Sequence, residues 1–99
     1  MDYKALTYFY HVATQQSFTR AAEVLEVAQP AVSMAIKRLE QQLQLTLFHR
    51  HERQISLTDE GERLYVQAQR IVQVMSDADL EMEELRGLEQ GAVQLGTPS

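Results

Sequence analysis

Short polar side chains recur at helical spacing beside a proline near the middle of the chain. Gln29, Ser33 and Lys37 are four residues apart, so they share one face of a helix, and Pro30 fits only in that helix's first turn. A glutamine amide donates and accepts together, as the edge of adenine requires, whereas a serine hydroxyl suits a base or a phosphate and a lysine suits a phosphate. This is the chemistry of a helix that enters the major groove of DNA.

Three helices and a hairpin are predicted to position these side chains. Asp2 can cap the first helix, and Ser17 can cap the second because its hydroxyl reaches the amide of Arg20. The third helix is predicted over residues 29–43, and its core-facing residues are Val32, Ile36, Leu39 and Leu43. Residues 47–50 and 54–57 then predict two short strands, which would form a small hairpin carrying Arg50 and Arg53.

A long helix is predicted after the hairpin. Thr58 can cap it, and Gly87 and Gly91 are expected to end it, so that residues 92–96 could begin a strand of something absent. Apolar residues recur along it at alternating spacings of four and three: Leu64, Ala68, Ile71, Met75, Ala78, Met82 and Leu85. This is a heptad pattern, and it is too long for a three-helix domain to cover. We therefore expect Ile71, Met75, Ala78, Met82 and Leu85 to form a dimer interface.

The combined motifs resemble the N-terminal DNA-binding domain and linker helix of the LysR-type transcriptional regulators, from residue 1 to about 90. The matching runs are SFTRAAEVL from Ser17, VAQPAVS from Val27, IKRLE from Ile36, LFHR from Leu47 and LTDEG from Leu57. The resemblance implies a mainly α fold: a winged helix-turn-helix of three helices and a two-stranded wing, followed by a long dimerisation helix. The implied function is a sequence-specific transcriptional regulator that binds a palindromic operator as a dimer.

The resemblance also assigns roles to individual residues. It implies base and groove contacts for Gln29, Pro30, Ser33 and Met34, backbone contacts for Ser17, Thr19 and Lys37, and a wing contact for Arg53. Position 34 is frequently arginine in the resembled family, but here it is Met34. A methionine favours an apolar contact, for example with a thymine methyl. Ala28 stands in place of a capping serine or threonine. The usual turn and wing glycines are replaced by Glu26, Gln44 and Glu52.

The resemblance divides the chain into three parts and implies further partners. Residues 1–58 would form the DNA-binding domain, 59–90 the linker and dimerisation helix, and 91–99 the hinge to an absent effector-binding domain. The implied partners are double-stranded DNA and a second copy of the chain through the long helix, with a tetramer at full length. A small-molecule effector would bind only through the absent domain, and no membrane partner is expected.

Charge and composition fit this interpretation and exclude several alternatives. The net charge is −5, but residues 1–58 carry six lysines and arginines against five acids, whereas residues 59–99 carry three against nine. There is no cysteine, which fits a reducing cytosol, and a cytoplasmic location is expected. The sequence shows no catalytic setting and suggests no cofactor, so we do not expect an enzyme.

The sequence offers three alternatives to this interpretation. His49 and His51 could both reach one metal, but a wing surface is the simpler account and no metal site is predicted. The acids at residues 77–84 lack the bent loop that calcium needs, so they indicate a solvated face. A different function class also stays open, namely a winged helix used for protein–protein assembly through the long helix.

Overall fold

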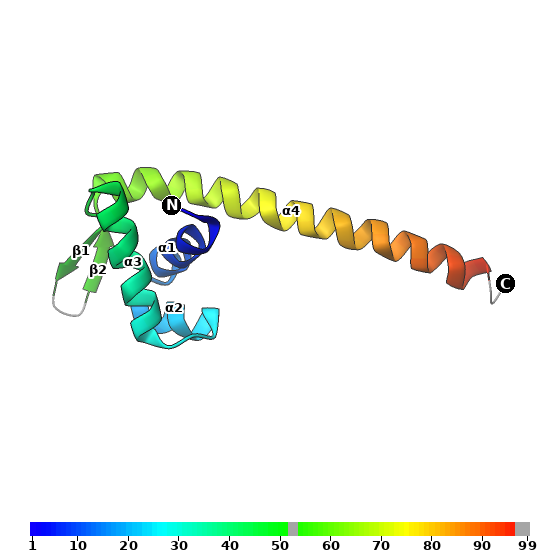
Figure 1. The fold of residues 1–99 in the computed structure, drawn as a ribbon, viewed down its shortest axis with the longest axis horizontal. Helices are drawn as coiled ribbons and strands as arrows, with labels where there is room; N and C mark the ends of the chain where they lie inside the picture. The colour runs from blue at the N-terminus through cyan, green and yellow to red at the C-terminus, as the bar shows by residue number, and fades with distance from the viewer. Residues whose placement is uncertain (52–53, 97–99) are drawn as a thin grey trace. The chain divides into compact units, whose positions relative to one another are not determined.

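The computed structural model describes the backbone of residues 1–51 and 54–96, and side chains as far as Leu88. Four helices and two strands follow one another in the described chain (Figure 1). Their bounds are α1 Tyr3–Gln15, α2 Phe18–Leu25, α3 Gln29–Leu43, β1 Phe48–His51, β2 Gln54–Leu57 and α4 Asp59–Gly96. Two compact units are distinguished, Met1–Gln69 and Arg70–Ser99, and α4 contributes to both. The predicted mainly α fold with a two-stranded wing and a long final helix is confirmed.

The core of the first unit lies between α1, α2, α3 and the start of the hairpin. Its buried apolar residues are Leu6, Phe9, Val12, Ala21, Ala22, Val32, Ile36, Leu39, Leu47, Phe48 and Ala68. The ring of Phe48 on β1 is close to two others, with centroids 5.3 Å from Phe9 and 6.0 Å from Phe18. The small faces of Ala21 and Ala22 let α2 pack against both α1 and α3. The core therefore fixes the exposed face of α3 relative to the hairpin.

The starts of the helices follow the capping predictions. The Asp2 carboxylate accepts a hydrogen bond from the Ala5 amide at 2.8 Å, and the Ser17 hydroxyl accepts one from the Arg20 amide at 3.1 Å. Thr58 Oγ1 accepts from the Gly61 amide at 2.9 Å and donates to the Thr46 carbonyl at 2.6 Å. Ala28, at the start of α3, makes no side-chain cap, as expected from its methyl side chain.

Three helix ends place a residue other than glycine in the left-handed conformation. The φ angles are 53° at Gln16, 59° at Glu26 and 57° at Gln44. Glu26 and Gln44 were noted from the sequence as replacements of turn glycines that are usual in the resembled family, and Gln16 was not noted. The conformation lets the chain reverse while its amides still find acceptors, as at Gln16, whose amide donates to the Val12 carbonyl at 2.8 Å.

The hairpin forms close to where the sequence placed it. Strands β1 and β2 are antiparallel, with Phe48 opposite Leu57 and His51 opposite Gln54. The first strand begins one residue later than predicted, at Phe48, and the Leu47 amide before it donates to the Glu40 carboxylate at 2.8 Å. The rings of His49 and His51 stack on the exposed side of β1, with centroids 5.7 Å apart.

The structure corrects one expectation about α4. Gly87 and Gly91 do not end the helix, and residues 92–96 are helical rather than extended. A single glycine disfavours a helix by only about 1 kcal/mol, which neighbouring helix-forming residues offset. The start of α4 packs on the core of the first unit through Leu64, Tyr65 and Ala68, and that compact unit extends to Gln69. No helix within the described residues combines the length and apolar character of a membrane span.

Tyr65 on α4 is joined to α1 by two contacts. Its hydroxyl lies 3.0 Å from the Thr14 hydroxyl, and its ring stacks on Tyr10 with centroids 5.7 Å apart. These contacts tie the first turns of α4 to α1, beside the His11 ring, which meets Tyr10 edge-on at 5.3 Å.

Burial of His11 gives the first unit a predictable pH dependence. Loss of hydration lowers the pKa of His11 below its ordinary value of 6.5. As pH falls through about 6.5, the unfolded chain takes up a proton that the folded chain resists, so the free energy of unfolding should fall. The stabilising effect is fully present above that pH. Urea denaturation across this range should show a weaker decline for His11→Gln, and an equal decline in both proteins would contradict the assignment.

Candidate nucleic-acid interface

The exposed face of α3 brings together most of the residues predicted to contact DNA. Gln29, Pro30 and Lys37 are exposed, Ser33 is half-buried, and Met34 exposes 54% of its surface. We call these five residues the recognition face.

A hydrogen bond within the recognition face orients its glutamine. Gln29 Nε2 donates to Ser33 Oγ at 3.0 Å, one helical turn away. The carbonyl oxygen and the second amide hydrogen of Gln29 stay available, as does the hydroxyl hydrogen of Ser33. This set matches adenine, which presents a donor at N6 and an acceptor at N7 in the major groove.

Ser17 and Thr19 lie at the N-terminal end of α2. Ser17 is half-buried and uses its oxygen as the helix cap, but its hydroxyl hydrogen can still be donated to a phosphate. Thr19, two residues further along the chain, is exposed. The positive end of the helix dipole favours an anion here, so both residues suit a contact with the DNA backbone.

Glu40 links α3 to the hairpin, a role that was not predicted from the sequence. Its Oε2 accepts from the Leu47 amide at 2.8 Å and from the Phe48 amide at 3.4 Å. Its Oε1 pairs with Arg50 Nη2 at 3.4 Å. One feature of the sequence could have indicated this role of Glu40. It is an acid one turn before the end of the predicted helix, followed by a strand that carries an arginine. The carboxylate supplies acceptors for two amides at the start of the hairpin.

Of the two arginines predicted on the hairpin, the structure describes only one. Arg50 on β1 is engaged by Glu40 and lies over the Phe18 ring, 5.3 Å from its centroid, so it braces the hairpin against α2. Arg53, the predicted wing contact, lies outside the described residues, as does Glu52. The structure therefore positions the base of the wing.

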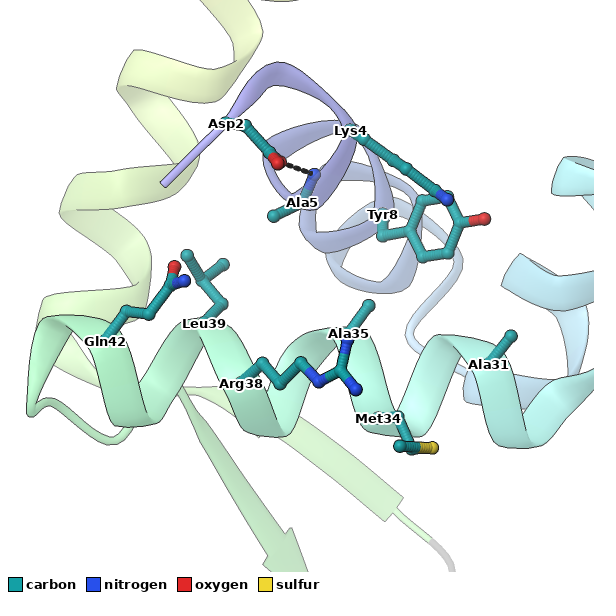
Figure 2. A pocket seen from close by; sticks show the side chains of 10 residues that line it. All are labelled: Asp2, Lys4, Ala5, Tyr8, Ala31, Met34, Ala35, Arg38, Leu39 and Gln42. Carbon is teal, nitrogen blue, oxygen red and sulfur yellow. Dashed lines mark hydrogen bonds between the residues drawn. The ribbon is translucent and has the colours of Figure 1, made fainter.

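A groove of about 470 Å³ runs between α1 and α3 beside the recognition face (Figure 2). It is lined by Asp2, Lys4, Ala5, Tyr8, Ala31, Met34, Ala35, Arg38, Leu39 and Gln42. Met34 belongs both to this groove and to the recognition face. The groove could not be predicted from sequence spacing, because it is formed by residues about thirty positions apart.

The predicted dimer residues are exposed within the second unit. Ile71, Met75, Met82 and Leu85 expose between 39% and 55% of their surface, and Ala78 is also exposed. We call these five residues the apolar stripe. Exposed apolar side chains in such a row are unusual on a soluble protein unless they are covered by a partner.

Comparison with known proteins identifies the family. The model of the bacterial regulatory helix-turn-helix proteins of the lysR family matches residues 3–62. The chain is 44% identical over 90 residues to the HTH-type transcriptional regulator CrgA of Neisseria meningitidis serogroup C (strain 8013), covering 91% of this chain and 30% of CrgA. It is 45% identical over 84 residues to YcgK of Bacillus subtilis (strain 168), an uncharacterised HTH-type regulator, covering 85% of this chain and 26% of YcgK. The chain thus spans less than a third of the length of these relatives.

Two solved structures share the fold. The DNA-binding domain of BenM in complex with catB site 1 DNA has a TM-score of 0.73 and 34% identity, covering 90% of this chain and 96% of that chain. The complex of the CbnR DNA-binding domain with DNA has a TM-score of 0.75 and 29% identity, covering 87% of this chain and 99% of that chain. With its winged helix-turn-helix, capped helices and long final helix, this chain belongs to the lysR family of bacterial regulatory helix-turn-helix proteins.

Proposed function

We propose that this chain is the DNA-binding part of a LysR-type transcriptional regulator, which binds a palindromic operator as a homodimer in the cytoplasm. The observation that carries the proposal is the recognition face of α3, where Gln29 and Ser33 form an oriented hydrogen-bonding pair beside Pro30. Support comes from BenM and CbnR, whose DNA-binding domains have been solved with DNA. The proposal includes no catalytic role, no metal and no cofactor.

Each predicted site residue has a role in this proposal. Gln29, Pro30, Ser33 and Met34 enter the major groove, where Met34 offers an apolar contact to a thymine methyl. Ser17, Thr19 and Lys37 contact phosphates on either side of the groove. Arg53 contacts the backbone or the minor groove from the wing. The basic residues give affinity, and the pair Gln29 and Ser33 gives sequence preference.

The partners are assigned in the same way. The apolar stripe pairs with the same stripe of a second copy, running antiparallel, which places two recognition faces on half-sites about one helical turn apart. A tetramer and a small-molecule effector are proposed for the full-length regulator, with the effector bound by a C-terminal effector-binding domain. The domain assignment is 1–58 for DNA binding, 59–90 for the linker helix and 91–99 for the hinge.

The sharpest test of the proposal is Gln29→Ala. Loss of a bidentate base contact should reduce discrimination between the specific duplex and random DNA by about 1–3 kcal/mol, and non-specific binding should change little. The measurement is a gel shift on the duplex that the wild-type chain selects from a random pool, with an unrelated duplex in parallel.

Gln41→Ala is the matched control, because Gln41 is an exposed glutamine near the other end of α3. It should keep the discrimination of the wild-type chain. An equal loss on both duplexes for Gln29→Ala would make Gln29 a backbone contact. Failure of the wild-type chain to select any duplex would contradict DNA binding and favour the protein-assembly alternative.

A further inference from the structure

We propose that the groove between α1 and α3 is a second contact site for the DNA backbone, in which Lys4 and Arg38 bind phosphates. This inference rests on the proposed function and extends its contact surface beyond the recognition face and the wing. Neither residue is among those that the sequence pattern assigns to DNA.

The placement of the groove relative to α3 is the first argument. In the view of Figure 2, α1 lies on one side of α3 and the strands β1 and β2 lie on the other. The major groove is about 12 Å wide and a helix with its side chains is about as wide, so the two phosphate backbones pass on both sides of an inserted helix. The hairpin faces one backbone. The groove between α1 and α3 then faces the other.

Continuity with the recognition face is the second argument. Met34 lies on that face and also lines the groove, and Arg38 follows it one helical turn later. A DNA strand that passes Met34 therefore meets Arg38 next. The planar guanidinium of Arg38 can bind a phosphate with two parallel hydrogen bonds. Met34 itself carries no charge, and the groove beside it is lined by the cations Lys4 and Arg38.

The charges of the groove are the third argument. Lys4 and Arg38 are both exposed, and among the described residues neither lies within 4.0 Å of a carboxylate. The one acid of the lining, Asp2, is engaged in capping α1 through the Ala5 amide at 2.8 Å. The Lys4 ammonium lies over the Tyr8 ring, 5.8 Å from its centroid, which orders it at the groove's edge (Figure 2). Two cations available to an anion thus face one opening.

The inference is tested by the salt dependence of binding to the duplex selected by the wild-type chain. Each lost phosphate contact should lower the slope of log K against log salt by about 0.9, so Lys4→Ala with Arg38→Ala should lower it by about 1.8. The factor by which affinity falls between 50 and 200 mM salt should therefore be about twelvefold smaller for the double variant than for the wild-type chain. Both side chains are exposed, so circular dichroism should show an unchanged fold.

Two controls separate a contact from a general loss of charge. Arg38→Lys keeps a cation and should keep the slope, whereas Arg63→Gln removes an exposed cation that does not line the groove and should change the slope less. A double variant whose slope matches that of Arg63→Gln would overturn the inference, while binding itself would still support the proposed function. Loss of the dimer in sedimentation with an unchanged slope would assign the groove to a second copy of the chain and also overturn it.

Discussion

Replacing Gly61 by alanine is expected to destabilise the first unit by about 1–3 kcal/mol, at the upper end of that range or beyond. A Cβ at this position would collide with the carbonyl oxygen of Leu47 and would lie 3.0 Å from a methyl group of Leu57. The carbonyl cannot move aside freely, because it accepts the Thr58 amide at 3.0 Å and belongs to a fully buried residue. Urea denaturation followed by circular dichroism gives the change in the free energy of unfolding.

Gly87→Ala is the matched control, with an expected change of opposite sign. Gly87 lies in the same helix, and nothing stands within 4 Å of a Cβ built there. Alanine should therefore favour the helix by about 0.5–1 kcal/mol. Equal and small effects at the two positions would show that the close approach between α4 and the start of the hairpin does not restrict residue 61.

The largest functional effect is expected from Met75→Glu combined with Met82→Glu. In a two-fold dimer this removes four buried methionines at about 1.5 kcal/mol each, or about 6 kcal/mol of association free energy. That is a weakening of about 10⁴-fold, before repulsion between the new carboxylates is counted. The variant should sediment as a monomer at concentrations where the wild-type chain is a dimer, and operator binding should fall far more than the stability of the first unit.

The control introduces the same two charges elsewhere on the helix. Gln73 and Leu80 are exposed, lie seven residues apart like Met75 and Met82, and lie off the apolar stripe. Gln73→Glu with Leu80→Glu should leave the dimer intact. A wild-type chain that is a clean monomer at tens of micromolar and still binds a palindromic duplex tightly would refute the dimer.

Local features of the fold could be predicted from the sequence because they depend on residues three or four apart. The capping bonds of Asp2, Ser17 and Thr58 are of this kind, and so is the burial of Val32, Ile36 and Leu39 on one side of α3. The shared face of Gln29 and Ser33 follows from the same spacing. The end of α4 was missed because a glycine weakens a helix without breaking it.

The rest of the site depends on tertiary contacts, which spacing does not reveal. Glu40 could have been one more exposed acid of α3, and only the return of the chain at Leu47 and Phe48 gives its carboxylate two amide donors. Likewise, Lys4 and Arg38 belong to different helices, and the groove exists because Leu6 and Phe9 of α1 pack into the same core as Ile36 and Leu39 of α3. The resemblance between motifs indicated the family, but it assigned neither the role of Glu40 nor the pairing of Lys4 with Arg38.

The left-handed residues Gln16, Glu26 and Gln44 let three helices end without a glycine. Each adds about 1–2 kcal/mol of backbone strain to the folded chain. Glycine would remove that strain, but it would also widen the range of conformations open to the unfolded chain, which lowers stability by about 0.4–1 kcal/mol. The two effects partly offset each other, so a helix end of this kind can exchange glycine for a polar residue at a net change of roughly 0–1.6 kcal/mol. The side chain gained at each turn therefore comes at little thermodynamic expense, and the surface of the turns can diverge among relatives while the path of the backbone stays the same.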